Sequence, residues 1–353
     1  MVWRFALASK LRITLERNTE PAAKIFVIGS NSFTGASFVD YLLARGHEVI
    51  GTSRSAQPSP AFLPYKWPAS RAHSASFEFR QLDLNHDTDR LAEAIQAFKP
   101  PYVFNFAAQS MVAESWLYPD QWYETNVVAN VRLHEELRKF DFLKKYVHVS
   151  TPEVYGSCSG NVTESAPFNP STPYAASRAA CDLHLMTFFK NYNFPVVFTR
   201  AANVYGPGQQ LYRIIPRTVF FIKTGQKLQL HGGGHSVRSF IHGRDVADAT
   251  LRIAQAAPAG ETYHLSTDLY LSIRDLVQRI CNQLGRKFED VVEIVGDRPG
   301  KDAAYLLDSS KARKTLGWEP RISLDQGIDE TIRWITDNLE ELKRQPANYI
   351  HKP

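Results

Sequence analysis

The residues best suited to chemistry follow a short apolar segment near the middle of the chain. Ser150, Thr151 and Glu153 come directly after a β-branched run, which is typical of a buried parallel strand. Tyr174 and Arg178 are four residues apart in an alanine-rich stretch, so both side chains would share one face of a helix. Because open parallel sheets place their chemistry beyond the carboxyl ends of the strands, this set predicts a site for proton and hydride transfer.

A glycine-rich turn near the start of the chain predicts where a dinucleotide would bind. Residues 24–28 form an apolar strand, the turn G-S-N-S-F-T-G runs from Gly29 to Gly35, and a helix follows to about residue 44. Such a turn directs backbone N–H groups and a helix N-terminus at a pyrophosphate. We expect Gly29 to permit the tight turn and Gly35 to permit close packing of the helix on the strand.

The segment after the second strand, residues 48–51, bears on the choice of cofactor. It carries Ser53, Arg54 and Ser55 and no acidic residue that could bind a ribose 2′-hydroxyl. A fixed positive charge with two hydroxyl donors suits a 2′-phosphate. The sequence therefore favours NADP, with NAD as the alternative if Arg54 is a solvated loop residue.

The remaining pattern alternates strands and helices and predicts an α/β fold, a Rossmann-type doubly wound parallel sheet. A change in composition after residue 203 predicts a smaller, discontinuous α+β substrate lobe towards the C-terminus. We expect an N-terminal extension (1–23), a dinucleotide-binding domain (24–203, rejoined by about 239–266) and a substrate-binding lobe (204–238 and 267–345). Residues 56–76 are expected to form a surface excursion, and Asp245 is expected to cap a helix.

The totals exclude several classes of protein. The 353 residues carry a net charge of only +5, without a lysine-rich tail, so a nucleic-acid partner is not expected. Three scattered cysteines predict a reducing, cytoplasmic setting without a bound metal. No apolar run reaches membrane-spanning length. The basic, partly apolar residues 1–23 would suit a packed extension or a targeting helix.

The motif S-T-x-E-V-Y-G, followed by P-Y-x-x-S-[K/R], resembles the extended short-chain dehydrogenase/reductase superfamily. The closest resemblance is to the nucleotide-sugar 4,6-dehydratases of dTDP-glucose and GDP-mannose, and it spans nearly the whole chain after residue 23. It implies oxidation of the sugar at C4, elimination of water across C5–C6 and return of the hydride to C6. In those roles Tyr174 is the base at the 4-hydroxyl, Thr151 donates to the 4-oxygen and Glu153 is the base at C5.

Three residues depart from the family pattern. Ser32 stands where the middle glycine of the turn is usual, and Arg178 stands where relatives carry lysine. Arginine would supply the positive field that a phenol needs in order to ionise near neutral pH. Pro152 replaces the aspartate with which dTDP-glucose dehydratases expel the 6-hydroxyl, so the acid would be Glu153, a water or another side chain.

The resemblance also implies two sets of contacts. The cofactor set is Gly29, Asn31, Ser32, Phe33, Thr34, Gly35, Ser53, Arg54, Ser55, Asp83, Leu84, Phe106, Ala107, Ala108, Gln109, Asn126 (as a brace of the backbone), Ser150, Tyr174, Arg178, Ala201 and Asn203. The nucleotide-diphosphate-sugar set is Ser110, Thr151, Pro152, Glu153, Asn203, Arg213, Ile214, Gln229, His231, Arg238, Arg298 and Lys301.

Other functions remain open from the sequence. A UDP-glucuronate decarboxylase or a 4-epimerase would use the same scaffold, although Glu153 would be idle in an epimerase. A nucleotide-sugar-binding protein with weak or no turnover would explain the three departures. Helices expected over 122–140 and 174–191 predict a homodimer that pairs through a four-helix bundle, as in relatives.

Overall fold

The structure is a computed structural model that describes residues 22–70, 76–158, 160–296 and 306–353. In this part of the chain, seven parallel strands form one sheet in the order β11-β7-β5-β4-β1-β2-β3. These strands are β1 (Lys24–Ile28), β2 (Glu48–Ser53), β3 (Phe77–Gln81), β4 (Tyr102–Asn105), β5 (Lys145–Val149), β7 (Val196–Ala201) and β11 (Thr262–Leu265). The strand order reverses between β1 and β4, and a doubly wound sheet binds its ligand at such a reversal. The predicted Rossmann-type fold is confirmed.

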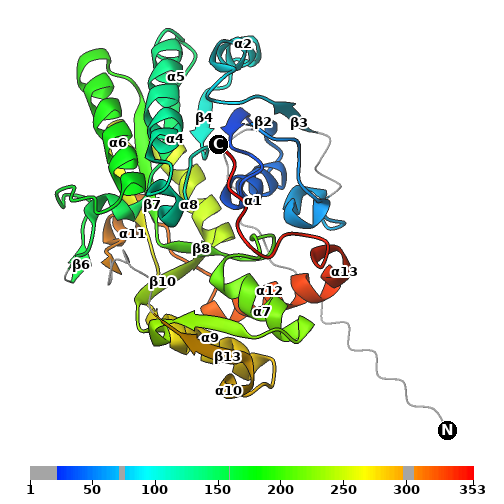
Figure 1. The fold of residues 1–353 in the computed structure, drawn as a ribbon. Coiled ribbons are helices and arrows are strands. Elements are labelled where there is room, and N and C mark those ends of the chain that lie inside the picture. The colour runs from blue at the N-terminus through cyan, green and yellow to red at the C-terminus, as the bar shows by residue number, and fades with distance from the viewer. Residues whose placement is uncertain (1–21, 71–75, 159, 297–305) are drawn as a thin grey trace.

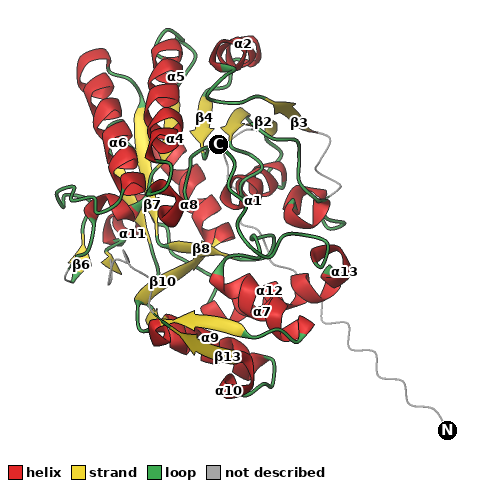
Figure 2. Ribbon diagram, in the orientation of Figure 1, coloured by secondary structure: helices red, strands yellow, loops and turns green. Residues whose placement is uncertain are grey.

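Helices cover both faces of this sheet (Figure 2). Strand β1 contributes side chains to a hydrophobic core on each face of the sheet. Ile25 and Val27 belong to the core under α1 and α8, whereas Phe26 and Ile28 belong to the core on the opposite face. Successive strand residues point to opposite faces, so a strand covered on both sides must be apolar throughout. The helices of this domain are α1 (Phe33–Leu43), α2 (Thr88–Phe98), α3 (Val112–Ser115), α4 (Pro119–Tyr123), α5 (Ala129–Leu137), α6 (Pro173–Tyr192), α8 (Gly243–Ala256) and α11 (Ser310–Leu316).

The helix expected over 122–140 is interrupted by one wide turn. A π-helical turn, Glu124–Val128, separates α4 from α5. The side-chain amide of Asn130 donates to the carbonyl of Thr125 at 2.9 Å and to that of Asn126 at 3.3 Å. Local π turns are frequent at functional sites, and this one presents Asn126 to the loop after β4.

The smaller lobe is built from two short sheets and the helices around them (Figure 1). Phe220, Leu276 and Ile335, from three of its helices, meet in a separate hydrophobic core. Its strands are β8 (Asn203–Tyr205), β9 (Leu228–His231), β10 (Val237–His242), β12 (Tyr270–Ser272) and β13 (Val292–Val295), and a further pair joins β6 (Asn161–Val162) to β14 (Leu306–Leu307). Its helices are α7 (Ile214–Thr224), α9 (Ile273–Gln283), α10 (Phe288–Val291), α12 (Leu324–Asp337) and α13 (Leu339–Leu342).

The segment expected to be a surface excursion is a packed connector. Its described part, residues 56–70, contains the 3-10 turns Pro60–Phe62 and Pro64–Lys66. Leu63 and Tyr65 are fully buried, and the indole of Trp334 on α12 donates to the carbonyl of Ala61 at 2.9 Å. The sequence prediction was wrong here because an apolar partner from a distant helix covers the segment.

Asp245 lies inside α8 and does not cap it. The N-cap is His242, whose imidazole Nδ1 accepts from the backbone N–H of Arg244 at 3.2 Å. The carboxylate of Asp245 accepts from the backbone N–H groups of Arg321 and Ile322 at 3.0 and 3.1 Å. It therefore ties the Rossmann helix to the loop before α12.

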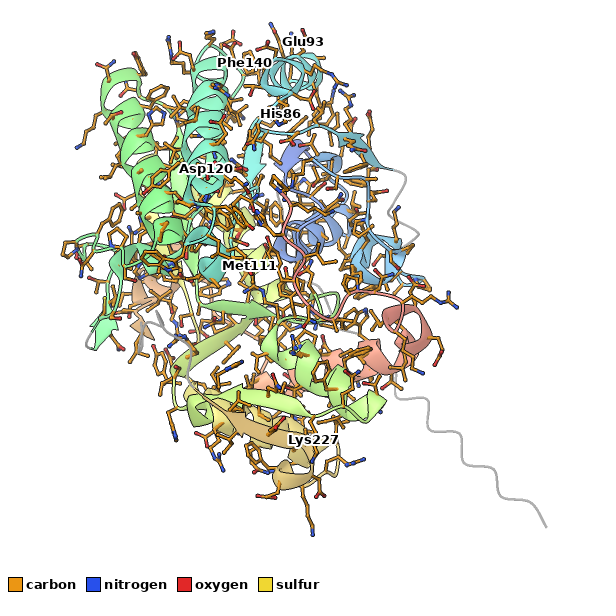
Figure 3. All side chains as sticks on the ribbon, in the orientation of Figure 1. His86, Glu93, Met111, Asp120, Phe140 and Lys227 are labelled. Carbon is orange, nitrogen blue, oxygen red and sulfur yellow. The ribbon has the colours of Figure 1, made fainter. Side chains whose placement is uncertain are left out.

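Among the described residues, no helix has the length and apolarity that crossing a membrane requires. Residues 1–21 of the expected extension, and the expected substrate residues Arg298 and Lys301, lie outside the described residues. Figure 3 labels Met111 in the loop after β4, at the junction of the two lobes, and Lys227 on the smaller lobe.

Candidate active site

The turn after β1 requires glycine at two positions. Gly29 has φ +82°, and a Cβ there would lie 2.6 Å from the backbone N of Ala107. A Cβ on Gly35 would lie 2.3 Å from the carbonyl oxygen of Gly29. Both distances are too short for a side chain, so the expected turn and the expected close helix packing are confirmed.

Ser32 uses its side chain to start α1. Its hydroxyl donates to the carbonyl of Gly29 at 2.8 Å and accepts from the N–H of Gly35 at 3.1 Å. It is therefore an N-cap, and it occupies one of the helix-terminal amides that would otherwise face a phosphate. The replacement of the middle glycine changes which amides remain available for an anion.

A cavity of about 320 Å³ lies beyond the carboxyl ends of β1, β2 and β4. Expected cofactor residues that line it are Gly29, Asn31, Ser32, Ser53, Arg54, Ser55, Asp83, Leu84, Phe106, Ala107, Ala108 and Gln109. Expected residues that do not line it are Phe33, Thr34, Gly35, Asn126, Ser150, Tyr174, Arg178, Ala201 and Asn203. Lining residues that the sequence reasoning missed are Ile28, Ala56, Pro58, Leu82, Asn85, Thr125, Gln210 and Lys352. Nothing in the sequence pattern links the last two of these to the turn after β1.

The residues of this cavity fit a dinucleotide. The glycine turn brings the backbone of β1 against the loop after β4, which leaves room for a pyrophosphate above it. The side-chain amide of Asn31 donates to the carbonyl of Ser55 at 2.9 Å, while its oxygen is buried without a hydrogen-bond partner. A buried, unpartnered acceptor facing such a cavity is the kind of group that a bound ligand satisfies.

The guanidinium of Arg54 is hydrogen-bonded within the protein, at a solvent-exposed position. Its Nη1 donates to the carbonyl oxygen of Pro353 at 2.5 Å, and its Nη2 donates to that of Lys352 at 3.2 Å. The guanidinium expected to bind a 2′-phosphate is thus in contact with residues nearly three hundred positions later in the chain.

The expected catalytic groups meet at the carboxyl end of β5. Tyr174, in the first turn of α6, is 8% exposed, and its phenol is hydrogen-bonded to the side chain of Thr151. Burial and the negative charge of Glu153 raise the pKa of Tyr174, whereas the positive charges of Arg178 and Arg213 lower it. The net shift is upward. Arg178 therefore acts on the phenol in the expected direction, but desolvation is the larger effect in the protein by itself.

Glu153 is oriented by a short turn. Thr151 accepts from the backbone N–H of Glu153 at 3.3 Å and caps the 3-10 turn Pro152–Tyr155. Proline suits the first position of such a turn, because its missing N–H would be unpaired there. Pro152 is buried and offers no proton. The turn thus places the carboxylate beside Tyr174 and supplies no second acid.

Arg178 is buried against the sheet. It is 1% exposed, donates to the carbonyl of Val149, and its Nη2 lies 3.1 Å from His148 Nε2. Burial holds the pKa of His148 well below its usual value, so the imidazole is neutral and accepts from the guanidinium. Arg178 Nη1 is buried without a hydrogen-bond partner.

His148 also belongs to a compact group with His134 and Cys181, whose ligand atoms all lie within 4.8 Å of one another. Burial raises the pKa of the Cys181 thiol to about 12 and lowers the pKa of His134 well below its usual value. Without a bound metal, burial therefore keeps these groups neutral behind Arg178.

Two expected cofactor residues act behind the cavity. Asn126 Oδ1 accepts from the N–H of Gln109 at 2.9 Å, and its Nδ2 donates to the carbonyl of Gln109 and to Ser177 Oγ, both at 3.0 Å. Ser150 donates to Asp182 at 2.6 Å, and Arg200 donates to the same carboxylate oxygen at 2.8 Å. Asn126 thus braces the loop after β4, while Ser150 belongs to a buried ion pair.

The expected substrate residues divide between the two lobes. Arg213 begins α7 and acts electrostatically on Tyr174, so the structure brings it to the catalytic groups. Asn203 donates to the carbonyl of Ser239 at 3.0 Å, and His231 Nδ1 lies 3.1 Å from the carbonyl of Gly296. Ser110 and Gln229 are exposed, Ile214 is half-buried, and Arg238 lies on β10 with its Nη1 donating to the carbonyl of Val237 at 2.8 Å.

Comparison with known proteins gives the same assignment. Residues 26–331 match the family model described as GDP-mannose 4,6 dehydratase. A dTDP-glucose 4,6-dehydratase of Xanthomonas campestris pv. campestris is 32% identical over 336 residues, covering 88% of this chain and 93% of its own length. The human dTDP-D-glucose 4,6-dehydratase is 31% identical over 281 residues, covering 77% of this chain and 79% of its own length.

Solved structures share the fold. A dTDP-glucose 4,6-dehydratase of Streptomyces venezuelae, solved with NAD bound, has a TM-score of 0.82 and 32% identity, and the match covers 90% of this chain and 98% of that one. A UDP-glucose 4-epimerase of Thermotoga maritima has a TM-score of 0.80 at 26% identity, with 90% and 99% coverage. The fold is thus shared by dehydratases and epimerases, whereas the higher identity lies with the dehydratases. The resemblance found in the sequence is confirmed: the chain belongs to the GDP-mannose 4,6-dehydratase family of nucleotide-sugar dehydratases, within the extended short-chain dehydrogenase/reductases.

Proposed function

We propose that the protein converts a nucleoside-diphosphate hexose into its 4-keto-6-deoxy derivative, with loss of water. The observation that carries this proposal is the carboxylate of Glu153 beside the Tyr174 phenol, which is itself hydrogen-bonded to Thr151. Epimerisation at C4 needs the phenol alone, whereas elimination across C5–C6 also needs a base for the C5 proton. The family relatives named above as 4,6-dehydratases support the same reaction.

The chain's own residues divide the proton transfers. Tyr174, as phenolate, takes the proton of the 4-hydroxyl, and Thr151 donates a hydrogen bond to the 4-oxygen. Glu153 then removes the C5 proton and, as a carboxylic acid, returns it to the departing 6-hydroxyl, so one proton leaves as part of water. Pro152 can take no part in this transfer. A bound nicotinamide dinucleotide would accept the hydride from C4 and return it to C6. Glu153 would then deliver a solvent proton to C5, and Tyr174 would release the proton of the 4-hydroxyl, so water is lost without net oxidation.

NAD is the proposed dinucleotide. The preference for NADP expected from Ser53, Arg54 and Ser55 has no support from the similar structures, which include dehydratases solved with NAD. The contacts of Arg54 with Lys352 and Pro353 also weigh against a free 2′-phosphate site. In the smaller lobe, Arg213 and Arg238 are the proposed partners of the substrate diphosphate, because guanidinium groups pair with phosphate in bidentate geometry.

A panel of dTDP-, UDP-, GDP- and CDP-hexoses tests the reaction, with dTDP-glucose first. Mass spectrometry in heavy water should show loss of one water, one solvent deuterium at C5 and a new methyl group at C6. Release of carbon dioxide from a UDP-glucuronate would identify a decarboxylase, and inversion at C4 without loss of mass would identify an epimerase. Tight substrate binding without any of these products would contradict the proposal and leave a binding protein.

We also propose a homodimer through α4, α5 and α6. Large apolar side chains are exposed on these elements and the π turn between them, at Tyr123 (41%), Val128 (38%), Leu183 (58%) and Tyr192 (49%). Pairing across a two-fold axis would bury them in a four-helix bundle. Light scattering should give twice the chain mass, and Leu183→Asp should give a monomer. A wild-type monomer at micromolar concentration would contradict the dimer.

A further inference from the structure

The segment of residues 347–353, here called the strap, leaves the smaller lobe and crosses to the carboxyl ends of β2 and β4 (Figure 1). At its start, Arg217 on α7 donates to the carbonyl of Ala347 at 3.3 Å and to Asn348 Oδ1 at 3.1 Å. The ring of Tyr349 then packs edge-on against Tyr212, with centroids 5.4 Å apart. The strap is thus fixed to the substrate lobe before it reaches the dinucleotide cavity.

The middle of the strap is anchored by one side chain. The imidazole of His351 stacks on Tyr118 with centroids 5.0 Å apart and on Trp122 with centroids 5.4 Å apart, nearly parallel to both rings. Its Nε2 lies 2.6 Å from Gln121 Oε1. Ile350, immediately before it, is 62% exposed. Thus alternate residues of the strap face the protein and the solvent.

The end of the strap spans the mouth of the cavity. The side-chain amide of Gln109, after β4, donates to the carbonyl of Lys352 at 2.8 Å. Arg54, after β2, donates to the same carbonyl and to that of Pro353. Lys352 also reaches Ser55, with Nζ 3.4 Å from Oγ, and it lines the cavity. The strap therefore joins the two loops between which a dinucleotide would lie.

The hydrogen bonds of Arg54 bear on which dinucleotide can bind while the strap is in place. A guanidinium recognises phosphate through paired N–H donors held in a fixed fork. Both terminal nitrogens of Arg54 already donate to strap carbonyls. A 2′-phosphate would have to displace these contacts, whereas a 2′-hydroxyl leaves them in place. Binding of NADP therefore carries the cost of opening the strap, which binding of NAD avoids.

We propose that the strap selects NAD over NADP, because its carbonyl groups hold Arg54 in hydrogen bonds and keep it from pairing with a 2′-phosphate. We also propose that the strap retains NAD in the closed site. This inference rests on the proposed function, because it requires a dinucleotide in the cavity. Retention suits a reaction in which the hydride is returned within each turnover. The ammonium of Lys352 acts against this selection, because it is a second cation beside Ser55 that could itself attract a 2′-phosphate.

Calorimetric titration of the protein with NAD and with NADP at one ionic strength tests the selection. Intact protein should bind NAD more tightly. Deletion of residues 349–353 should lower the ratio of the NADP to the NAD dissociation constant by about tenfold, which corresponds to about 1.4 kcal/mol. In the Arg54→Gln background the same deletion should leave that ratio unchanged. A double-mutant comparison of this kind isolates the contribution of Arg54.

Milder variants separate the strap from general damage to the fold. His351→Ala should loosen the strap and shift the ratio in the same direction as the deletion, whereas Ile350→Ala should not shift it. Both should keep the wild-type melting temperature to within a few degrees. Dissociation of bound NAD, followed by dialysis or by displacement, should be faster in the deletion and His351→Ala variants than in the Ile350→Ala control.

Three results would overturn the proposal. The first is a ratio of the NADP to the NAD dissociation constant that is the same with and without residues 349–353, when both dinucleotides bind. The second is an equal effect of the deletion in the Arg54→Gln background. The third is a greater loss of NADP than of NAD binding in Lys352→Ala, which would make the strap a phosphate site. Failure of the intact protein to bind either dinucleotide would overturn the proposed function as well.

Discussion

At the scale of single residues, the ionisation of Tyr174, the proposed base, depends on its burial and on the charges around it. The pKa of Tyr174 is raised first by burial and then by the charge of Glu153, and it is lowered by Arg178 and Arg213. A base that must be ionised loses activity as the pH falls through its pKa. The two arginines and any charge brought by the ligands must therefore offset desolvation before the phenol can act.

The first residue-scale prediction concerns Glu153→Gln. Removal of the carboxylate should slow water loss and solvent exchange at C5 by about a hundredfold or more, the usual contribution of a positioned base. Oxidation at C4 should survive, and its pH profile should move to lower pH, because Glu153 raises the pKa of Tyr174. Single-turnover absorbance of reduced nicotinamide and deuterium incorporation measure the two steps separately. Unchanged water loss would show that another group is the base.

The second residue-scale prediction concerns Arg178→Lys. Lysine keeps the positive charge and can still donate to the carbonyl of Val149 or to His148, the present partners of Arg178. Turnover should therefore stay within about tenfold of wild type or rise, a change of about 1.4 kcal/mol in the barrier. Arg178→Met is the matched control of similar length. Its turnover should fall well below that of the lysine variant, and its pH profile should be displaced upward, because the charge of Arg178 lowers the pKa of Tyr174. A well-folded but inactive lysine variant would contradict the role given to the charge.

At the scale of elements, the sequence predicted what depends on local chemistry. The strand, glycine turn and helix from Lys24 to Leu43 follow from a buried apolar run and from two positions that admit only glycine. The segment 56–70, the role of Asp245 and the position of the strap depend instead on partners far along the chain. The sequence of a segment does not indicate which distant residues will pack against it, so those features could not be predicted.

The candidate site shows the same division. Thr151, Glu153 and Tyr174 were predicted because they follow one strand and begin one helix, and the structure brings them together. Lys352 lines the dinucleotide cavity but belongs to no recognisable motif. Ser150 was expected to contact the cofactor and instead donates to Asp182. Asp182 is the partner of Arg200 in a buried ion pair.

The element-scale prediction concerns the π turn that carries Asn126. Asn126→Ala would leave the buried N–H and carbonyl of Gln109 without their partner. An unsatisfied buried group costs about 1–3 kcal/mol, so the free energy of unfolding should fall by about that amount and dinucleotide affinity should weaken. Val127→Ala, in the same turn and half-buried, is the control. Urea unfolding measures the first effect and calorimetric titration measures the second. Wild-type stability and affinity in Asn126→Ala would show that the loop after β4 does not depend on Asn126.

At the scale of the whole molecule, buried histidines join distant elements in their neutral form. His264 on β11 lies 2.7 Å from the Tyr155 hydroxyl and 3.1 Å from the carbonyl of Val162. His242, at the end of β10, accepts from the N–H of Arg244 and lies 3.5 Å from Glu330 on α12. Protonation at these junctions would place positive charge where burial and neighbouring arginines oppose it.

This arrangement predicts how stability depends on pH. Burial, followed by the charge of Arg244 or Arg200, lowers the pKa of His242 and of His264 to about 3. The unfolded chain takes up these protons near the usual pKa of about 6.5, so it binds more protons than the folded state between about pH 6.5 and about pH 3. The free energy of unfolding is therefore unaffected by these groups above about pH 6.5. Below it, stability should fall by up to about 1.4 kcal/mol per pH unit for each histidine.

Urea unfolding at several pH values between 7.5 and 5 measures the slope directly, roughly spanning the onset of this loss. Whatever the change of the helix cap costs, His242→Asn should reduce the slope by about one proton's worth, about 1.4 kcal/mol per pH unit. His86→Gln is the matched control, since His86 is exposed, and the slope of this variant should match that of the wild type. An unchanged slope in His242→Asn would mean that His242 binds its proton equally in the folded and unfolded chains, and it would contradict the lowered pKa. A steeper loss of stability with falling pH in the variant would mean that His242 is charged in the folded protein, with Glu330, 3.5 Å from its Nε2, as its ion-pair partner.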